Sequence, residues 1–208
     1  MQLSSTSFQD GERIPEAYAF GVPDERTHVT FGPNRNPHLR WSGAPEGTRS
    51  FAVVCHDRDV PTKPDDVNQE GREVPADLPR ADFFHWVLVD VPPGVSEIAE
   101  GAFADGVVER GRDTTESPIG TRQGANDYTG WFAGDDDMEG MYFGYDGPCP
   151  PWNDSLVHHY TFTLWALDVD RLDVEGAFNG QEVRVAIESH ALDSASMIGT
   201  YTLNPRLA

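Results

Sequence analysis

Three short segments of the chain carry the hydrophobic pattern of buried β-strands. They cover residues 50–55, 84–91 and 158–167, are rich in aromatic and β-branched residues, and are bounded by Pro, Gly or Asp. Such residues pack well on the pleated surface of a sheet. A last short strand is predicted at 201–203, and the frequent prolines before residue 40 predict an irregular first quarter. The pattern therefore predicts a mainly β protein.

Helical spacing occurs only near the end of the chain. Asn179 is a favourable N-cap, and Glu182 three residues later completes the capping-box pattern. Apolar residues then follow at intervals of three and four from Val183 to Ala191. The pattern predicts one helix here and a second, weaker one over 192–197.

A long polar stretch, from about residue 101 to 144, separates the second and third predicted strands. Its acidic run at 135–139 lacks the ligand spacing of a calcium loop, so we interpret it as a solvent-exposed loop. The stretch also contains two aromatic segments, 128–133 and 141–143. We expect them to pack against the sheets or to form a homodimer contact.

The length and the cysteine content of the chain indicate a single domain without disulfide bonds. Its 208 residues show no internal repeat and no linker, which predicts a single domain over 1–208. No apolar run is long enough to span a membrane and the first residues do not resemble a signal peptide, so we expect a cytoplasmic protein without stable membrane insertion. Cys55 and Cys149 are expected to be reduced thiols.

The strongly negative charge argues against nucleic acid and anionic lipid as binding partners. The formal net charge is -20, and Lys63 is the only lysine among 15 basic residues. Such a chain lacks the basic face of a nucleic-acid-binding protein and is repelled by anionic lipid. The excess of aspartate and the near absence of lysine fit a halophilic protein, in which concentrated salt screens the self-repulsion.

Polar residues at the ends of the predicted strands carry the candidate chemistry. Because side chains alternate along an extended chain, Asp57 and Asp59 are expected to point to one side. His158 and Tyr160 share a face by the same rule, and His85 is placed on the apolar face of its strand with Val87, Val89 and Val91. Taken singly, each of these residues is more often structural than functional.

The loop before the third predicted strand supports a binding role for these polar residues. Residues 144–151 are dense in proline and glycine, which fixes the backbone in advance and orients exposed amide groups towards a ligand at little entropic cost. The loop leads within seven residues to His158. These residues therefore form a candidate binding site.

Seven segments spread along the chain form an ordered set of short motifs. They are 36–41 (NPHLRW), 57–61 (DRDVP), 85–87 (HWV), 144–151 (GYDGPCPP), 158–162 (HHYTF), 189–192 (SHAL) and 199–201 (GTY). In this order they resemble the signature segments of a known family, the phosphatidylethanolamine-binding proteins, over nearly the whole chain. They are most similar to its bacterial and archaeal branch, often described as Raf kinase inhibitor-like.

The resemblance implies an antiparallel β-sandwich with Greek-key connections and a few peripheral α-helices, one of them near the C-terminus. It also implies a small pocket at one end of the strands that binds anions such as phosphate or a phosphoethanolamine head group. By this resemblance, the ligand-binding residues are Asp57, Asp59, His85, Gly147, Pro148, His158 and Tyr160.

Two features depart from the family pattern or complicate it. Arg58 stands where the family usually has proline, and the acidic run at 135–139 is an insertion. Two carboxylates beside an anion would also repel it, so we expect them either to orient and charge His85 and His158 or to hold a proton themselves. Phosphate should then bind more tightly as the pH falls towards 6, because protonated imidazoles add positive charge.

The predicted function is a non-enzymatic binding protein without a cofactor, whose partner is a small phosphorylated or carboxylated ligand. One alternative is a metal-assisted hydrolase in which Asp57, Asp59, His85 and His158 hold the ion. Another is an inhibitor that acts by protein contact on a kinase or a protease. The sequence shows no apolar groove that would hold acyl chains.

Overall fold

The computed structural model describes residues 1–112 and 117–208, so part of the predicted polar stretch lies outside the described residues. At its centre is an antiparallel five-stranded sheet in the order β12-β11-β5-β6-β9. The third predicted strand is found at its predicted limits, and the first two are longer than predicted. The strands are β5 (Ser50–Pro61), β6 (Arg80–Val91), β9 (Arg122–Gln123), β11 (His158–Leu167) and β12 (Ala191–Tyr201).

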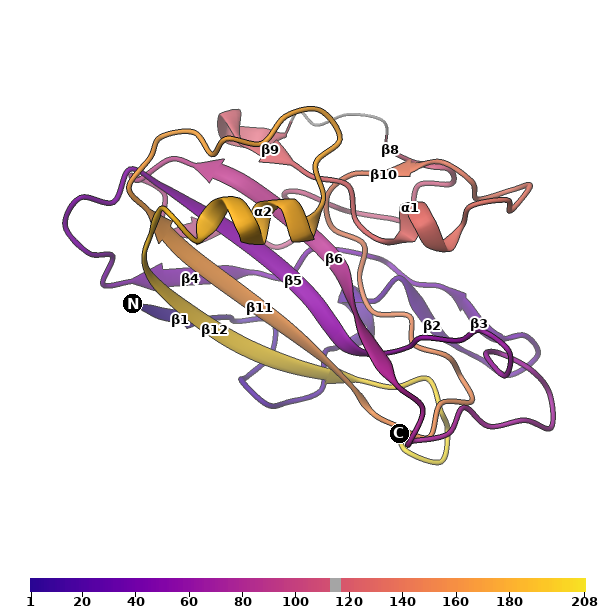
Figure 1. Cartoon of the computed structure of the whole chain (residues 1–208). Coiled ribbons are helices and arrows are strands. Elements are labelled where there is room, and N and C mark those ends of the chain that lie inside the picture. Colours follow the sequence, from indigo (N-terminus) through magenta and orange to yellow (C-terminus); the bar gives the residue numbers. More distant parts are fainter. Residues whose placement is uncertain (113–116) are drawn as a thin grey trace.

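A second, smaller sheet lies against one face of the central sheet (Figure 1). It pairs β1 (Gln2–Ser4), β4 (Leu39–Ser42) and β7 (Glu97–Ile98) antiparallel. Both inner faces are apolar, so large side chains fill the space between the two sheets. This core includes Trp41, Phe51, Trp86, Leu88, Phe162 and Leu164. The predicted mainly β sandwich is confirmed.

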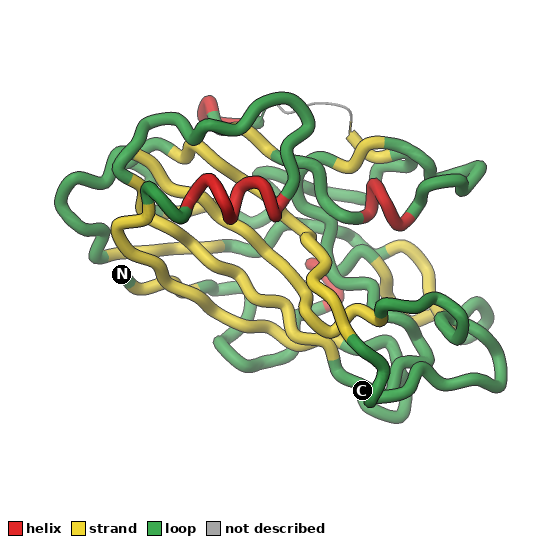
Figure 2. Tube along the Cα trace, in the orientation of Figure 1, coloured by secondary structure: helices red, strands yellow, loops and turns green. Residues whose placement is uncertain are grey.

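Helix α2 (Gly180–Ile187) covers the opposite face of the central sheet (Figure 2). The predicted capping box is present, because the Asn179 side chain accepts a hydrogen bond from the Glu182 backbone and the Glu182 side chain accepts one from Asn179. Each buried aliphatic side chain on this face contributes about 1.5–3 kcal/mol. The cluster under the helix includes Val54, Val87, Phe178, Val183 and Ile187.

Smaller elements lie around the sandwich. A hairpin joins β2 and β3, and β8 pairs with β10 in parallel. Short helices complete the described chain. The elements are β2 (Gly21–Asp24), β3 (His28–Phe31), β8 (Gly111–Arg112), β10 (Met141–Tyr142), α1 (Tyr128–Trp131) and the 3-10 turns Glu16–Tyr18 and Pro118–Gly120.

The end of the chain differs from the prediction in three ways. The helix ends at Ile187 rather than near Ala191, residues 192–197 form part of strand β12 instead of a second helix, and the strand predicted at 201–203 is only the end of β12 at Tyr201. Strand β12 pairs with β11 along almost its entire length. Long-range pairing with a neighbouring strand outweighs the weak local preference of this small and polar segment.

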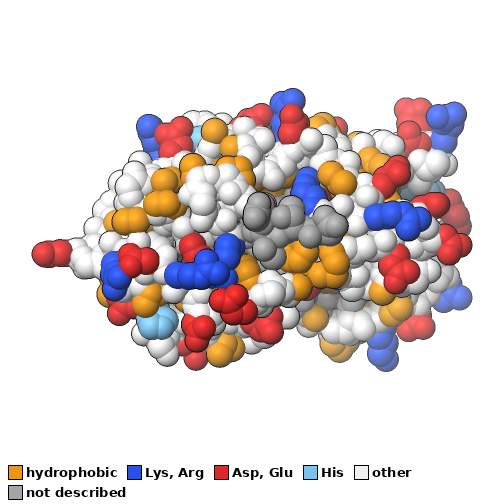
Figure 3. Space-filling model, turned by 90° about the horizontal axis from the view of Figure 1, so that it is seen from above, with side chains coloured by type: hydrophobic (Ala, Val, Ile, Leu, Met, Phe, Trp, Pro, Cys, Tyr) orange, Lys and Arg blue, Asp and Glu red, His pale blue; other side chains and the backbone are white. Residues whose placement is uncertain are grey.

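Acidic and basic side chains lie close together on the face shown in Figure 3. Exposed arginines form ion pairs with aspartates, as in Arg72 with Asp66. Such exposed pairs contribute little to stability individually. No helix among the described residues has both the length and the apolar character needed to cross a membrane.

Candidate functional site

A cavity of about 500 Å³ opens where the end of β5 meets the beginnings of β6 and β11. Antiparallel pairing brings these strand ends together, because Asp57 lies opposite both Phe83 and Tyr160. The β2–β3 hairpin, helix α1 and residues 149–151 contribute the other walls. Segments far apart in the sequence therefore share one pocket.

His85 points into this cavity because of a β-bulge. Trp86 pairs with Cys55 and Phe84 pairs with His56, which leaves His85 as the extra residue between the two pairs. The bulge turns the ring towards Tyr160, with a centroid distance of 5.0 Å. The predicted alignment of His85 with the face that carries Val87 and Val89 is therefore wrong, since those valines pack under α2.

The His85 ring offers one free nitrogen to the cavity. Nδ1–H donates to the Asp146 carbonyl at 2.8 Å, and Nε2 has no hydrogen-bond partner within the described chain. Burial lowers the pKa of His85 below its ordinary value, although the nearby Asp57 carboxylate opposes this shift. The neutral ring thus presents Nε2 as an acceptor.

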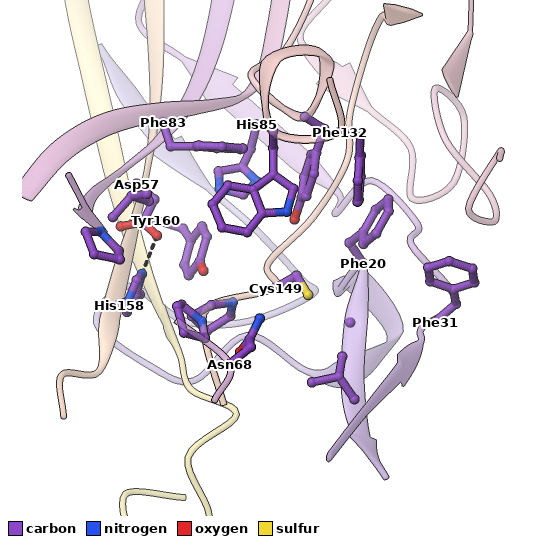
Figure 4. Close-up of a pocket in the computed structure, with 18 of the residues that line it drawn as sticks. Phe20, Phe31, Asp57, Asn68, Phe83, His85, Phe132, Cys149, His158 and Tyr160 are labelled. Carbon is purple, nitrogen blue, oxygen red and sulfur yellow. Dashed lines mark hydrogen bonds and ion pairs between the residues drawn. The ribbon is translucent and has the colours of Figure 1, made fainter. Parts of the chain in front are cut away.

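His158 is held between two carboxylates and has no nitrogen left for a ligand. Nδ1 lies 2.6 Å from Asp57 Oδ2 (dashed in Figure 4), and Nε2 lies 3.1 Å from Asp154 Oδ2. Burial acts to lower the pKa of His158, but the hydrogen bonds to Asp154 and Asp57 raise it to about 9. The charged ring positions Asp57 instead of contacting a bound anion.

Asp154 was not recognised from the sequence, although it stands four residues before His158. Arg80 donates to both of its carboxylate oxygens, at 2.6 and 3.0 Å. Burial acts to raise the pKa of Asp154, but the hydrogen bonds from His158 and Arg80 lower it. Four side chains thus form an ion row of alternating charge that is neutral as a whole. The members of this ion row are Asp57, His158, Asp154 and Arg80.

Asp57 and Asp59 do not point the same way. Asp57 is buried and lines the cavity, whereas Asp59 accepts hydrogen bonds from the backbone N–H and from Nδ1 of His159, both at 2.9 Å, and does not line it. The register is irregular between Asp57 and Val60, which breaks the expected alternation. Arg58 is exposed to solvent.

Tyr160 brings a free hydroxyl group to the cavity. The residue is only 1% exposed and lines the cavity, and its hydroxyl has no hydrogen-bond partner among the residues described. By contrast, the hydroxyl of buried Tyr128 donates to the Gly147 carbonyl at 2.9 Å. Because Tyr160 lines the cavity, its hydroxyl is available to a bound molecule.

Gly147 and Pro148 lie behind the cavity wall and do not line it. The Gly147 N–H donates to Asn34 Oδ1 at 2.8 Å, and the Pro148 carbonyl accepts from the Gly21 N–H at 3.1 Å. These bonds fix the position of Cys149, which does line the cavity with the two prolines that follow it. The loop therefore supports the site by shaping its wall.

The sequence also failed to reveal an apolar wall. The aromatic segment 128–133 lines the cavity together with residues of the β2–β3 hairpin, whereas Tyr142 and Phe143 of the other aromatic segment are buried in the fold. This wall gives the cavity an apolar surface that the sequence did not predict. Its aromatic members are Phe20, Phe31, Phe83, Tyr128, Trp131 and Phe132.

The arrangement does not favour the metal-assisted hydrolase. Of the four ligands considered, Asp59 binds His159, and both ring nitrogens of His158 are occupied by carboxylates. Over residues 1–112 and 117–208, no three His, Cys, Asp or Glu side chains are arranged to hold a metal ion.

Comparison with known proteins finds relatives over the whole chain. UPF0098 protein YbcL of Escherichia coli is 30% identical over 97% of this chain and 87% of its own length. A UPF0098 protein of Methanothermobacter thermautotrophicus is 32% identical over 97% of this chain and 98% of its own.

Solved structures agree with the sequence relatives. The crystal structure of E. coli YbcL matches with a TM-score of 0.69 and 29% identity, covering 97% of each chain. A homologue from Chlamydia trachomatis, CT736, matches with a TM-score of 0.62 and 27% identity over 96% of this chain and 95% of its own. The sequence profile described as phosphatidylethanolamine-binding protein matches residues 4–202. The chain therefore belongs to the phosphatidylethanolamine-binding protein family.

Proposed function

We propose that this chain is a non-enzymatic binding protein that holds the anionic group of a small phosphorylated or carboxylated ligand. The anion would lie at the polar end of the cavity, against His85 and Tyr160. The observation that carries this proposal is the pair of unpartnered polar atoms there, Nε2 of His85 and the Tyr160 hydroxyl oxygen, on buried side chains. Both residues line the cavity, where these atoms can form hydrogen bonds to the oxygen atoms of a ligand.

The charge at this end of the cavity is compatible with an anion. Asp57 is neutralised by His158, so its carboxylate does not act as an unpaired negative charge. None of the described residues that line the cavity is Lys or Arg. Binding must therefore depend on hydrogen bonds and on a proton gained by His85.

Proton uptake gives the proposal a distinct pH dependence. In the free protein burial keeps the pKa of His85 low, and a bound anion would raise it by stabilising the imidazolium. Each anion bound would then take up a proton, so affinity should increase as the pH falls from 8 towards 6.

A ¹H–¹⁵N NMR titration with inorganic phosphate at pH 6 and pH 8 tests this function. We expect saturable shifts at Asp57 and Tyr160, with tighter binding at pH 6. Tyr160→Phe should weaken binding about tenfold through loss of one hydrogen bond to a charged group. Tyr142→Phe is the matched control, because that hydroxyl bonds the Met138 carbonyl at 2.8 Å outside the cavity. Unchanged spectra with phosphate at both pH values would refute the proposal.

A further inference from the structure

The cavity has a polar end and an aromatic end. In Figure 4, Asp57, His158 and Tyr160 gather on one side, and Phe20, Phe132 and Phe31 lie on the other. All six side chains line the same cavity. A molecule that fills it would therefore meet hydrogen-bonding groups at one end and ring surfaces at the other.

The cavity is much larger than an inorganic anion requires. Its volume is about 500 Å³, whereas one water molecule takes up roughly 30 Å³ of liquid. A phosphate group at the polar end leaves most of this space unoccupied. Volumes of this size are typical of pockets that enclose an organic molecule.

The rings at the apolar end are arranged in parallel. Phe20 and Tyr128 stack at 4.5 Å with an interplanar angle of 18°, and Tyr128 and Phe132 stack at 5.6 Å with 16°. The ring of His85 meets Tyr128 edge to face at 5.6 Å. The aromatic wall thus reaches directly to the residue that we propose binds the anion.

Two further aromatic residues of the wall have much of their surface exposed. Phe31 is 52% exposed and Trp131 is 45% exposed, and both line the cavity. Exposed side chains of this size contribute little to the folded core, yet they offer apolar surface that a ligand can cover.

We propose that the ligand carries a compact aromatic group attached directly to its phosphate or carboxylate. The anion binds His85 and Tyr160, and the ring packs on the aromatic wall, including its exposed members Phe31 and Trp131. Rings pack against one another in preferred stacked and edge-to-face geometries that a flexible alkyl chain cannot reproduce. This inference rests on the proposed function and specifies its ligand class.

Calorimetric titration with three phosphates tests the inference. We expect phenyl phosphate to bind at least tenfold more tightly than inorganic phosphate. We also expect it to bind more tightly than n-hexyl phosphate, by a factor of about three or more. Equal affinities for all three, or tighter binding of n-hexyl phosphate, would overturn the aromatic class and leave the anion site standing. If none of the three binds, the proposed function itself fails.

Variants of the exposed wall residues separate the two ends of the cavity. Trp131→Ala and Phe31→Ala should each weaken phenyl phosphate binding about threefold or more, while inorganic phosphate binds as before. Val185→Ala is the matched control, since Val185 is 57% exposed and lies on α2, away from the cavity. Phenyl phosphate affinity that is unchanged in both wall variants would contradict the inference.

Discussion

His158 donates its Nε2–H to Asp154, four residues earlier in the chain, while its Nδ1–H binds Asp57 on the neighbouring strand β5. Arg80 of β6 binds the same Asp154 carboxylate. One buried ion row therefore ties together the ends of β5, β6 and β11, where the cavity lies. The row holds Asp57 in place at the edge of the cavity.

Stability should decrease as the pH rises through about 9. The pKa of His158 is raised above its ordinary value, so its contribution is complete below pH 6.5 and is lost as the folded pKa is passed. The full loss is on the order of 3 kcal/mol. Urea unfolding at intervals from pH 6 to pH 9.5 measures it. His158→Gln cannot titrate and should show a flatter profile, and equal slopes in the two proteins would rule out this assignment.

Asp154→Asn should destabilise the fold by about 3–5 kcal/mol, because it leaves His158 and Arg80 with an uncompensated buried charge. The chain provides a matched control in Asp59→Asn, which removes a carboxylate from an exposed histidine, His159. That variant should change stability little. Urea unfolding at pH 7 compares them, and a similar cost for both would show that burial of the ion row is unimportant.

His56 should destabilise the fold in acid. Its ring is buried without partners for either nitrogen, and burial, with the nearby Arg184 and Arg58 charges, lowers its pKa to about 4 despite the opposing Asp82 and Asp57. A lowered pKa means that stability falls as the pH drops from 6.5 through 4. We expect a loss of about 2 kcal/mol.

The measurement compares His56→Leu with the native chain between pH 7 and pH 4. Asp146 acts in the opposite direction, since burial raises its pKa to about 6 and its protonation relieves a buried charge as the pH falls. Both proteins contain Asp146, so the difference between their profiles isolates His56. Parallel profiles would contradict this prediction.

The acidic surface should make stability depend on salt. At a net charge of -20, repulsion opposes the folded state in dilute buffer. The melting temperature should rise by several degrees between about 0.1 M and about 2 M KCl as charges are screened. A double variant, Asp136→Asn with Asp137→Asn, should show a smaller rise. A melting temperature independent of salt would exclude the halophilic interpretation.

Local patterns predicted the elements that depend on local interactions. The apolar runs identified β5, β6 and β11, and the pair Asn179 and Glu182 identified the start of α2. The strand β12 was missed because its small and polar residues are held by pairing with β11 rather than by their own preference. Propensity alone could not have shown this.

The candidate site was only partly predictable for a related reason. The bulge at His85 and the irregular register after Asp57 each reverse the side on which a side chain lies. An alternation rule cannot foresee such a register change. The aromatic wall brings together Phe20 and Phe132, whose proximity depends on the folded arrangement of loops. Sequence spacing contains no signal for this contact.

Gly147→Ala should cost several kcal/mol and weaken phosphate binding. A Cβ atom at this position would lie 1.9 Å from the Tyr18 carbonyl oxygen, so the backbone of the loop must move. This movement would break the hydrogen bond from the Gly147 N–H to Asn34. It would also displace Asp146, whose carbonyl accepts the hydrogen bond from His85 Nδ1–H.

Gly130→Ala is the control, because a Cβ atom there meets nothing within 4 Å and the residue lies in helix α1. Alanine in a helix is favoured over glycine by about 0.5–1 kcal/mol, so this variant should be as stable as the native chain or more stable. Urea unfolding and the phosphate titration measure both variants. Native stability and affinity in Gly147→Ala would show that the loop does not depend on close packing against Tyr18.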